Sequence, residues 1–261
     1  MAMRLALALV LACLGLPAQA QSGSCSARSQ AGTTALVELY TSEGCDSCPP
    51  ADRWLSSLGE KGLVPGKLVP IALHVDYWDY IGWKDPFAKR EFTLRQRLHA
   101  QLKRSRLVYT PQVILQGHDF RGWATGSFER ELARINARPA AARIALRIVP
   151  GRPGAFEVEA EAEVLDPAQR ADAALYLATY ESRLQSEVRA GENRGKTLGH
   201  DFVAFEWRGP LALGAAGKLR DRRSLPLLPK AIPAHSGVVA FVQNRASGEV
   251  LQALMLPACR S

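Results

Sequence analysis

Short apolar runs alternate with amphipathic stretches through the first half of the chain. The runs are β-prone and too short for helices, whereas the stretches between them repeat apolar residues at helical spacing. In the second of these stretches, Phe87, Leu94, Leu98 and Leu102 are spaced to lie along one face. The expected elements are strands at 36–40, 68–75, 112–115 and near 120, and helices at 51–58, 87–103 and 128–136. The predicted order is β-α-β-α-β-β-α, in which consecutive strands joined by a helix run parallel.

The pattern changes at Pro139 and the alanines that follow it. Beyond them, apolar residues alternate with charged ones at 144–149 and 156–164, and four glutamates share the water-facing side of the second segment. Further strands are expected at 174–180, 202–207, 238–242 and 250–256. This spacing is typical of a mostly antiparallel β-sandwich. The sequence thus predicts two domains, at 30–138 and 140–258.

Residues 1–20 have the layout of a secretory signal peptide. A basic end precedes an apolar run over 5–16, and Ala18-Gln19-Ala20 forms a small-residue cleavage site. A lipid anchor on Cys13 is the alternative, but Leu11 fits that signal poorly. No later segment reaches the roughly 18 uninterrupted apolar residues of a membrane helix. We therefore expect cleavage near Ala20, no membrane span, and a periplasmic or secreted protein.

The composition is that of an ordinary folded protein, with 47% hydrophobic and 22% charged residues. The formal net charge is +8, and much of it is local, since residues 84–106 hold eight Lys/Arg against Asp85 and Glu91. This basic segment is either a solvated helix face or a docking surface for an acidic partner. Nucleic-acid partners are not expected, because no nucleic-acid-binding motif occurs.

Four cysteines remain after the predicted cleavage, and an even number in an oxidising compartment suggests disulfides. Cys45 and Cys48 form a C-x-x-C pair, which leaves Cys25 and Cys259 near the two ends of the mature chain. A bridge between those two would close a loop of 234 residues. In the chain-entropy model such a bridge stabilises by roughly 4–5 kcal/mol. Two unpaired terminal thiols are the alternative.

The C-x-x-C pair stands between an apolar strand and the start of a helix. Backbone N–H groups and the helix dipole stabilise a thiolate there, which lowers the pKa of the thiol and makes it a nucleophile. Pro49 and Pro50 suit the first helical turn. We assign the attacking role to Cys45, expected to be the more exposed, and the resolving role to Cys48. A zinc site is disfavoured, since neither a second C-x-x-C nor H-x₃₋₅-H spacing occurs, so no metal or cofactor is expected.

Thr110-Pro111 stands at the start of the strand 112–115, a position that proline tolerates. With the strand–C-x-x-C–helix unit and the element order, it resembles the thioredoxin superfamily. The resemblance implies that 30–138 is an α/β thioredoxin-like domain with a mixed sheet. It also implies a cis bond at Pro111, packed against the redox pair, and a substrate contact through the backbone of Thr110. An ordinary trans proline is the alternative.

Glu38 is a further candidate under this resemblance. Thioredoxins carry a buried acid on the strand before the C-x-x-C, which relays protons to the resolving cysteine. Glu38 lies on that strand, one residue further from the first cysteine than is usual. Burial of an unpaired carboxylate would raise its pKa. The alternative is a glutamate whose side chain reaches solvent at the edge of the sheet.

Longer motifs narrow the resemblance. The run Val37-Glu38-Leu39-Tyr40-Thr41-Ser42-Glu43-Gly44-Cys45-Asp46-Ser47-Cys48-Pro49-Pro50-Ala51-Asp52 resembles the signature of a bacterial family of secreted thioredoxin-like proteins, domain of unknown function 1223. The same family is matched by the motifs at 74–79, 82–83, 85–87, 109–112 and 191–195. The resemblance covers nearly all of the mature chain and implies a fold and a redox class, but no substrate.

Two further features are candidate site elements. Trp78 and Trp83 belong to a group of four aromatic residues after the end of a strand, where α/β sites tend to lie. They form either a platform for an unfolded or apolar substrate or ordinary packing within a loop. The polar residues 192–194 and His200-Asp201 reach either toward the redox pair or into solvent. An exposed hairpin is favoured, because loops are normally exposed.

The leading hypothesis is a thiol–disulfide oxidoreductase of the cell envelope, acting on exported proteins or small thiols through Cys45 and Cys48. The alternative is a non-catalytic thioredoxin-fold protein whose cysteine pair binds copper(I) or a protein partner, although Pro111 would obstruct the metal. A third hypothesis is a permanent structural bridge, which the reducible nature of a C-x-x-C loop disfavours. The direction of exchange depends on the relative stability of the two redox forms, which the sequence does not set.

Overall fold

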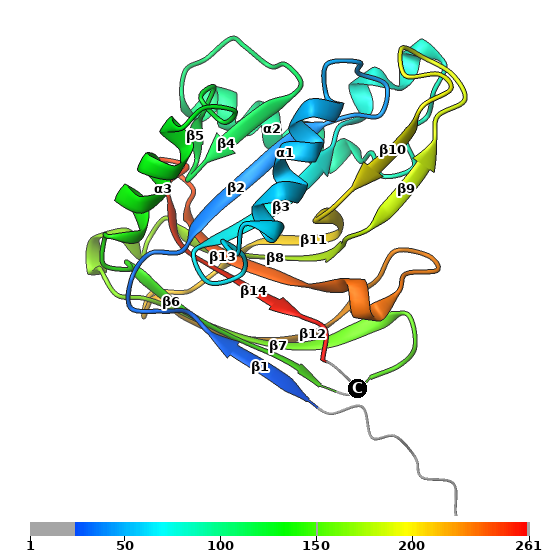
Figure 1. Cartoon of the computed structure of the whole chain (residues 1–261). Helices are drawn as coiled ribbons and strands as arrows, with labels where there is room; N and C mark the ends of the chain where they lie inside the picture. Colours follow the sequence, from blue (N-terminus) through cyan, green and yellow to red (C-terminus); the bar gives the residue numbers. More distant parts are fainter. Residues whose placement is uncertain (1–23, 150, 260–261) are drawn as a thin grey trace, which may run out of the picture.

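The computed structural model describes residues 24–149 and 151–259 (Figure 1). The predicted signal peptide (1–20), its cleavage site near Ala20 and the alternative anchor at Cys13 lie outside the described residues. Two β-sheets pack face to face, and three α-helices flank one end of the larger sheet. Among the described residues, none of the helices has the length and apolar character needed to cross a bilayer.

The larger sheet has eight strands and draws on both halves of the chain. β2 lies between its parallel partner β3 and its antiparallel partner β4, and β11 pairs in parallel with β3 through Val203 and Ala72. In spatial order the strands are β14 (Val250–Pro257), β13 (Ser236–Asn244), β8 (Ala173–Glu181), β11 (Val203–Ala212), β3 (Leu68–His74), β2 (Ala35–Thr41), β4 (Gln112–Leu115) and β5 (His118–Asp119). The sheet is therefore mixed around β2 and β3 and antiparallel from β11 to β14.

The smaller sheet is antiparallel and packs on the β8–β13–β14 part of the larger one. Its strands are β1 (Cys25–Arg28), β6 (Ala142–Val149), β7 (Ala155–Val164) and β12 (Lys218–Pro226). Inward residues such as Ile144 and Val158 share a core with Leu175 and Val238. The glutamates of β7 point outward as predicted, and Glu159, Glu161 and Glu163 pair with basic residues of β6 and β12, for example at 3.2 Å between Glu161 and the Arg220 Nε.

The boundary predicted at Pro139 coincides with a change of sheet. After α3 (Ser127–Asn136) the chain enters β6 of the smaller sheet, and it reaches the larger sheet again at β8. The segments 30–138 and 140–258 then share one sheet, because β11 adds to the edge of β3; the N–H of Ala72 donates to the carbonyl of Phe202 at 2.8 Å. Backbone groups along a strand edge form this junction, so the pattern of side chains in the sequence does not predict it.

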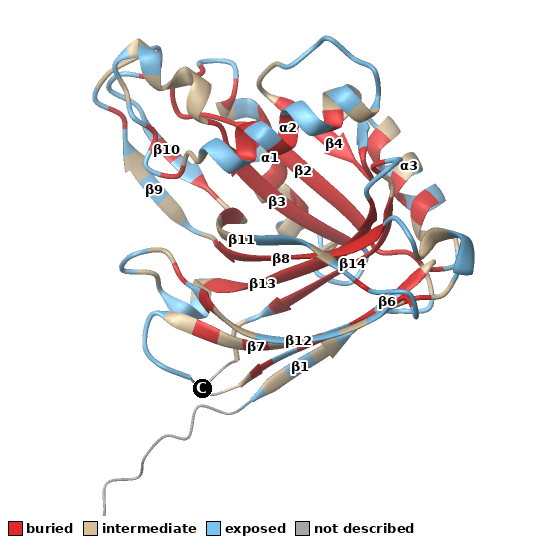
Figure 2. Ribbon diagram, turned by 180° about the vertical axis from the view of Figure 1, so that it is seen from behind, coloured by how far each residue is buried: buried red, intermediate tan, exposed pale blue. Residues whose placement is uncertain are grey.

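Helices cover both faces of β2, which is buried along its whole length (Figure 2). Val37 and Leu39 pack with α1 (Pro49–Glu60) and α3, and Leu36 and Tyr40 pack with Phe92 of α2 (Arg90–Leu102). The period-two alternation of a strand therefore decides which side chains of β2 face α1 and which face α2.

The inward face of α2 differs from the one that its apolar spacing predicts. Leu94 and Leu98 are 51% and 43% exposed, whereas the buried side carries Phe92, Arg95 and His99. Arg95 donates to the buried carboxylate of Glu38 on β2. Charge pairing with the sheet thus sets the rotation of this helix against its leucine pattern.

Cys25 and Cys259 form a disulfide. Cys25 begins β1 in the smaller sheet and Cys259 follows β14 in the larger, so the bond joins the two layers near the ends of the chain. The remaining elements are the ribbon of β9 (Leu184–Glu187) and β10 (Thr197–His200) and the short 3₁₀ helices η1 (Asp76–Ile81), η2 (Pro167–Gln169) and η3 (Pro233–His235).

Candidate functional site

The loop 42–48 carries the C-x-x-C pair from the carboxyl end of β2 to the start of α1. Cys45 and Cys48 are joined in a disulfide, and Cys48 is the N-cap residue of the helix. The N–H of Cys48 donates to the carbonyl of Cys45, and Pro49 occupies the first helical turn, where no donor is needed. The apolar run, the turn and the prolines thus produce the local structure that the sequence predicts.

Both cysteines are fully buried, at 0% exposure, while Asp46 and Ser47 between them are exposed. The expectation that Cys45 is the more exposed of the two is therefore wrong for this oxidised state. Residues from distant parts of the chain pack around this loop, so the local sequence does not predict its burial.

The connection between β9 and β10 contacts the C-x-x-C loop; we call residues 188–196 the cover loop. Its Asn193 is fully buried and donates from Nδ2 to the carbonyls of Glu43 and Cys45, both at 2.9 Å. Glu192 accepts a hydrogen bond from the N–H of Asp46 at 3.1 Å. The favoured expectation of an exposed hairpin is thus wrong at Asn193, because its amide satisfies backbone carbonyls that are buried with it.

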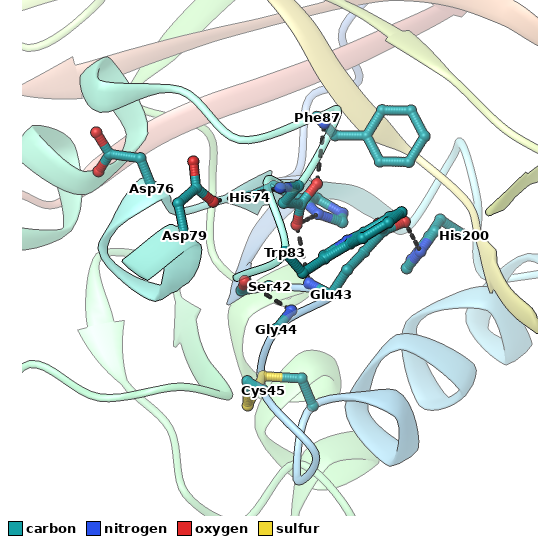
Figure 3. Close-up of polar contacts among 12 residues, drawn as sticks. Ser42, Glu43, Gly44, Cys45, His74, Asp76, Asp79, Trp83, Phe87 and His200 are labelled. Atoms are coloured by element: carbon teal, nitrogen blue, oxygen red, sulfur yellow. Dashed lines mark hydrogen bonds and ion pairs between the residues drawn. A yellow bond between two sulfur atoms is a disulfide. The ribbon is translucent and has the colours of Figure 1, made fainter. Parts of the chain in front are cut away.

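A network of ionisable side chains lies beneath the loop (Figure 3). Glu43 and His200 share a hydrogen bond of 3.1 Å, and Trp83 Nε1 donates to the other carboxylate oxygen of Glu43 at 2.8 Å. The His74 ring lies 4.9 Å from the His200 ring and shares a hydrogen bond of 2.7 Å with Asp85. All four ionisable groups are buried, and the strand β10 supplies one of them from the second half of the chain.

Charge pairing between His74 and Asp85 shifts the pKa of both groups. Burial lowers the pKa of His74, but the Asp85 carboxylate outweighs burial and raises it. Burial acts against the Asp85 charge, yet His74 and two backbone N–H groups hold the pKa of Asp85 below its usual range. Asp52, one helical turn after Cys48, has its pKa raised by burial. A groove of about 420 Å³ between α1 and the ribbon is lined by Asp52 and His200 and opens the network to the surface.

The Thr110–Pro111 peptide bond is cis. β4 begins at Gln112, opposite Tyr40, so Pro111 lies beside the end of β2, where the chain enters the C-x-x-C loop. The Thr110 hydroxyl accepts a hydrogen bond of 2.7 Å from Trp78 Nε1. The structure thus brings the predicted pair 110–111 to the same edge of the sheet as the disulfide.

Trp78 and Trp83 are half-buried and packed. The backbone oxygen and Cβ of Trp78 lie 3.4 and 3.2 Å from the position that a Cβ on Gly44 would take, and Trp83 is bonded to Glu43. Trp78 thus contacts the C-x-x-C loop through its backbone and Cβ, and Trp83 contacts it through its indole N–H. The predicted aromatic group also contains Tyr77 and Tyr80, of which Tyr80 is exposed, at 82%.

Glu38 does not fit the predicted role of proton relay. It lies on the face of β2 that packs on α2, opposite to the face covered by α1. Burial raises the pKa of Glu38, but Arg95 and His99 lower it to about 2, because the Arg95 guanidinium and the His99 Nε2, at 2.8 Å, contact the two carboxylate oxygens. A carboxylate held ionised in this way does not exchange protons near neutral pH. Its function is to neutralise Arg95.

No group of three His, Cys, Asp or Glu side chains within 24–149 and 151–259 is arranged to hold a metal ion.

The profile of the family described as "Protein of unknown function (DUF1223)" matches residues 36–243, which span the C-x-x-C loop, the Thr110–Pro111 bond and the cover loop. The chain belongs to the DUF1223 family. No curated protein matches this DUF1223 sequence.

Two solved structures are similar to this DUF1223 chain. Protein AGR_C_4864 from Agrobacterium tumefaciens aligns with a TM-score of 0.62 at 24% identity, covering 89% of this chain and 98% of its own. HBP35 of Porphyromonas gingivalis aligns with a TM-score of 0.63 at 13% identity, covering 89% of this chain and 77% of its own. At these identities the likeness concerns the fold alone.

For this DUF1223 site, the sequence predicts no role for Asp52 and favours an exposed position for Asn193 and His200. Asp52 follows Cys48 at the spacing of one helical turn, which is a usable signal for a shared helix side. Asn193 and His200 carry no local signal of burial, because both stand in polar, turn-rich sequence. Only the pairing of β9 with β10 and their packing along α1 bring them to the C-x-x-C loop.

Proposed function

We propose that this DUF1223 protein is a thiol–disulfide oxidoreductase of the cell envelope, acting on exported proteins or small thiols through Cys45 and Cys48. The observation that carries the proposal is the position of their bond. It closes across three residues at the N-cap of α1, where α1 follows a buried strand of the larger sheet. After reduction, a thiolate at this helix terminus is stabilised by the free N–H groups and the helix dipole.

We further infer that 30–138 is thioredoxin-like. The inference is supported by the element order β2-α1-β3-α2-β4-β5-α3 and by the spatial strand order β3-β2-β4-β5. It is also supported by the placement of α1 and α3 on one face of β2 and of α2 on the other. The two disulfides favour an oxidising compartment, in agreement with the expected periplasmic or secreted location.

The exchange step is balanced by the two cysteines. A partner thiolate attacks Cys45 Sγ and forms a mixed disulfide, while the Cys45–Cys48 bond breaks and its electron pair leaves with Cys48 as a thiolate. A second partner thiolate then attacks the partner sulfur and releases the Cys45 thiolate. The partner loses two electrons to form a disulfide, and the C-x-x-C pair gains them. In the reverse direction the Cys45 thiolate attacks a partner disulfide.

Attack on the buried pair requires displacement of the segments that cover it. The cover loop is the segment suited to move, since it is a surface connection whose contact with 42–46 rests on side-chain hydrogen bonds from Glu192 and Asn193. Displacement of the cover loop leaves the backbone of β2 and α1 intact.

A redox titration tests the proposal. The mature protein is equilibrated in thiol–disulfide buffers, the free thiols are alkylated, and each bond is followed by peptide mapping, with Cys25–Cys259 as the internal comparison. We expect the midpoint potential of Cys45–Cys48 to lie above about −300 mV, so that this bond is reduced in buffers in which Cys25–Cys259 stays oxidised. A Cys45–Cys48 bond that stays oxidised well below about −300 mV is a structural bridge and overturns the proposal.

Trapping tests the roles of the two cysteines. Cys48→Ser should accumulate mixed disulfides through Cys45, because no resolving thiol remains, whereas Cys45→Ser should not. The opposite result would reverse the assignment. Copper(I) binding, the alternative use of the pair, would appear as one-to-one uptake under reducing conditions that Cys45→Ser abolishes.

A further inference from the structure

The solvent face of α2 carries leucines and arginines that the packing of the fold leaves uncovered. Positions 90, 94, 97, 98 and 101 lie on one side of the helix, since they are spaced by three and four residues. Arg90, Leu94, Arg97 and Leu98 are all exposed. This face is the one turned outward when Arg95 and His99 bind Glu38.

The segment after α2 continues the same surface. Leu107 and Val108 are 57% and 37% exposed, and Arg104 and Arg106 beside them are exposed as well. The sequence contains no acidic residue from 92 to 118. Among the described residues, Arg97, Arg104 and Arg106 have no ion-pair partner. We call residues 90, 94, 97, 98, 104, 106, 107 and 108 the basic–apolar face.

The basic–apolar face leads to the redox pair. Gln96 donates from Nε2 to the carbonyl of Tyr109 at 2.8 Å, so the segment after α2 runs back along the helix toward Thr110. The Thr110 hydroxyl is bonded to Trp78, which packs against Gly44, the residue before Cys45. The segment 103–111 and the C-x-x-C loop lie at the same end of the molecule in Figure 1.

We propose that the basic–apolar face binds an extended polypeptide with interleaved acidic and apolar residues, and that this polypeptide is the substrate class of the redox pair; the second statement rests on the proposed function. Charge complementarity selects the acidic residues, since the cations have no partner within the described chain. The exposed leucines and the valine select the apolar residues of the ligand, because they give the face an apolar surface to cover. Arginines alone would bind acidic residues without any preference for apolar ones. The face from 90 to 101 is about 16 Å long, which matches about five residues of extended chain.

Peptide binding tests the proposal directly. The probe is a fluorescent unstructured peptide of alternating Glu and Leu residues, with a Lys/Leu peptide of equal length as its comparison, bound to the oxidised mature protein and followed by anisotropy. We expect the acidic peptide to bind and the basic one not to bind, with an affinity that falls as salt rises. Arg97→Glu/Arg104→Glu should weaken binding roughly tenfold or more, and Leu94→Ser/Leu98→Ser several-fold.

The matched control is Arg130→Glu/Arg152→Glu, which changes the charge equally at two exposed arginines outside this face. It should change the affinity less than about twofold, because exposed charges beyond a Debye length are screened. The proposal is overturned if Arg97→Glu/Arg104→Glu and Arg130→Glu/Arg152→Glu weaken binding equally. It is also overturned if the acidic and the basic peptide bind equally well. Anionic lipid vesicles that bind through the same residues while the acidic peptide does not would make the face a membrane-binding surface and would also overturn it.

The redox reaction separates this inference from the proposed function. Reduction of Cys45–Cys48 by dithiothreitol should be unchanged in Arg97→Glu/Arg104→Glu, whereas exchange with a cystine-containing acidic peptide should slow as binding weakens. A redox-active pair with no peptide binding contradicts only the basic–apolar face. A bound acidic peptide with an inert pair contradicts the proposed function, and with it the assignment of the peptide as substrate.

Discussion

Replacing Glu38 by glutamine tests how much the buried ion pair between β2 and α2 stabilises the fold. Glu38 is completely buried, and its two oxygens contact Arg95 and His99. Arg95 in turn lies over the rings of Tyr176 and Trp207. Glutamine keeps the size of the side chain but leaves the guanidinium without a counter-charge. Breaking a buried pair on one side in this way costs about 3–5 kcal/mol.

The pH dependence gives an independent value. The pKa of Glu38 is about 2 in the folded protein, against an ordinary value of 4.5. At about 1.4 kcal/mol per pH unit this difference corresponds to about 3 kcal/mol at neutral pH. Because the folded pKa is the lower one, this stability is present above pH 4.5 and is lost as the pH falls toward about 2. Glutamine does not titrate, so the variant lacks this loss.

Urea unfolding followed by tryptophan fluorescence measures the difference between wild type and Glu38→Gln at several pH values. We expect the difference to shrink by about 2 kcal/mol between about pH 5.5 and about pH 3. Glu161→Gln is the control. Glu161 forms an exposed pair with Arg220, so the variant should differ from wild type by less than about 1 kcal/mol. A difference for Glu38→Gln that stays constant with pH would refute the assignment of a low pKa to Glu38.

Three further outcomes are expected. Asn193→Ala removes two hydrogen bonds to the C-x-x-C loop and should speed reduction of Cys45–Cys48 roughly tenfold, whereas Asn136→Ala, which loses two comparable bonds near β2, should not; equal rates would show that the cover loop does not limit access. Cys25→Ser/Cys259→Ser opens a loop of 234 residues and should lower the free energy of unfolding by up to about 5 kcal/mol in urea, and a loss below about 1 kcal/mol would contradict a stabilising bridge. Asp85→Asn should lower the pKa of His74 in an NMR titration, because the variant removes the carboxylate that raises it. The stability that the raised pKa contributes is present below the ordinary value of 6.5 and is lost as the pH rises through the raised value. An unchanged His74 titration in the variant would argue against the pairing.

Elements with compact apolar runs were predictable. The strand predicted at 36–40 is β2 (Ala35–Thr41), and the strand at 112–115 is β4 as predicted. β12 and the ribbon β9–β10 were missed, because their sequences are polar and short of apolar alternation. Their strand structure comes from backbone pairing with neighbours, which the local pattern does not contain.

The inward side of α2 illustrates the limit of hydrophobic spacing. The leucines at 94 and 98 follow a helical repeat, yet the helix buries Arg95 and His99 because both contact the buried carboxylate of Glu38 on β2. The cost of leaving the Glu38 charge buried and unpaired exceeds what two leucines gain by burial. Such a pairing involves residues 57 apart in the sequence and is invisible to a window of one helix.

The sequence by itself determined the C-x-x-C cysteine pair, its place between a strand and a helix, and the elements around it, because each depends on residues close along the chain. The tertiary structure alone decided that the pair is buried, that Asn193 contacts Cys45 and His200 contacts Glu43, and that β11 joins the two halves into one sheet. Those facts depend on which strand edges meet and which charges must be neutralised in the interior. Contacts of that kind form between segments more than one hundred residues apart, so only the folded chain specifies them.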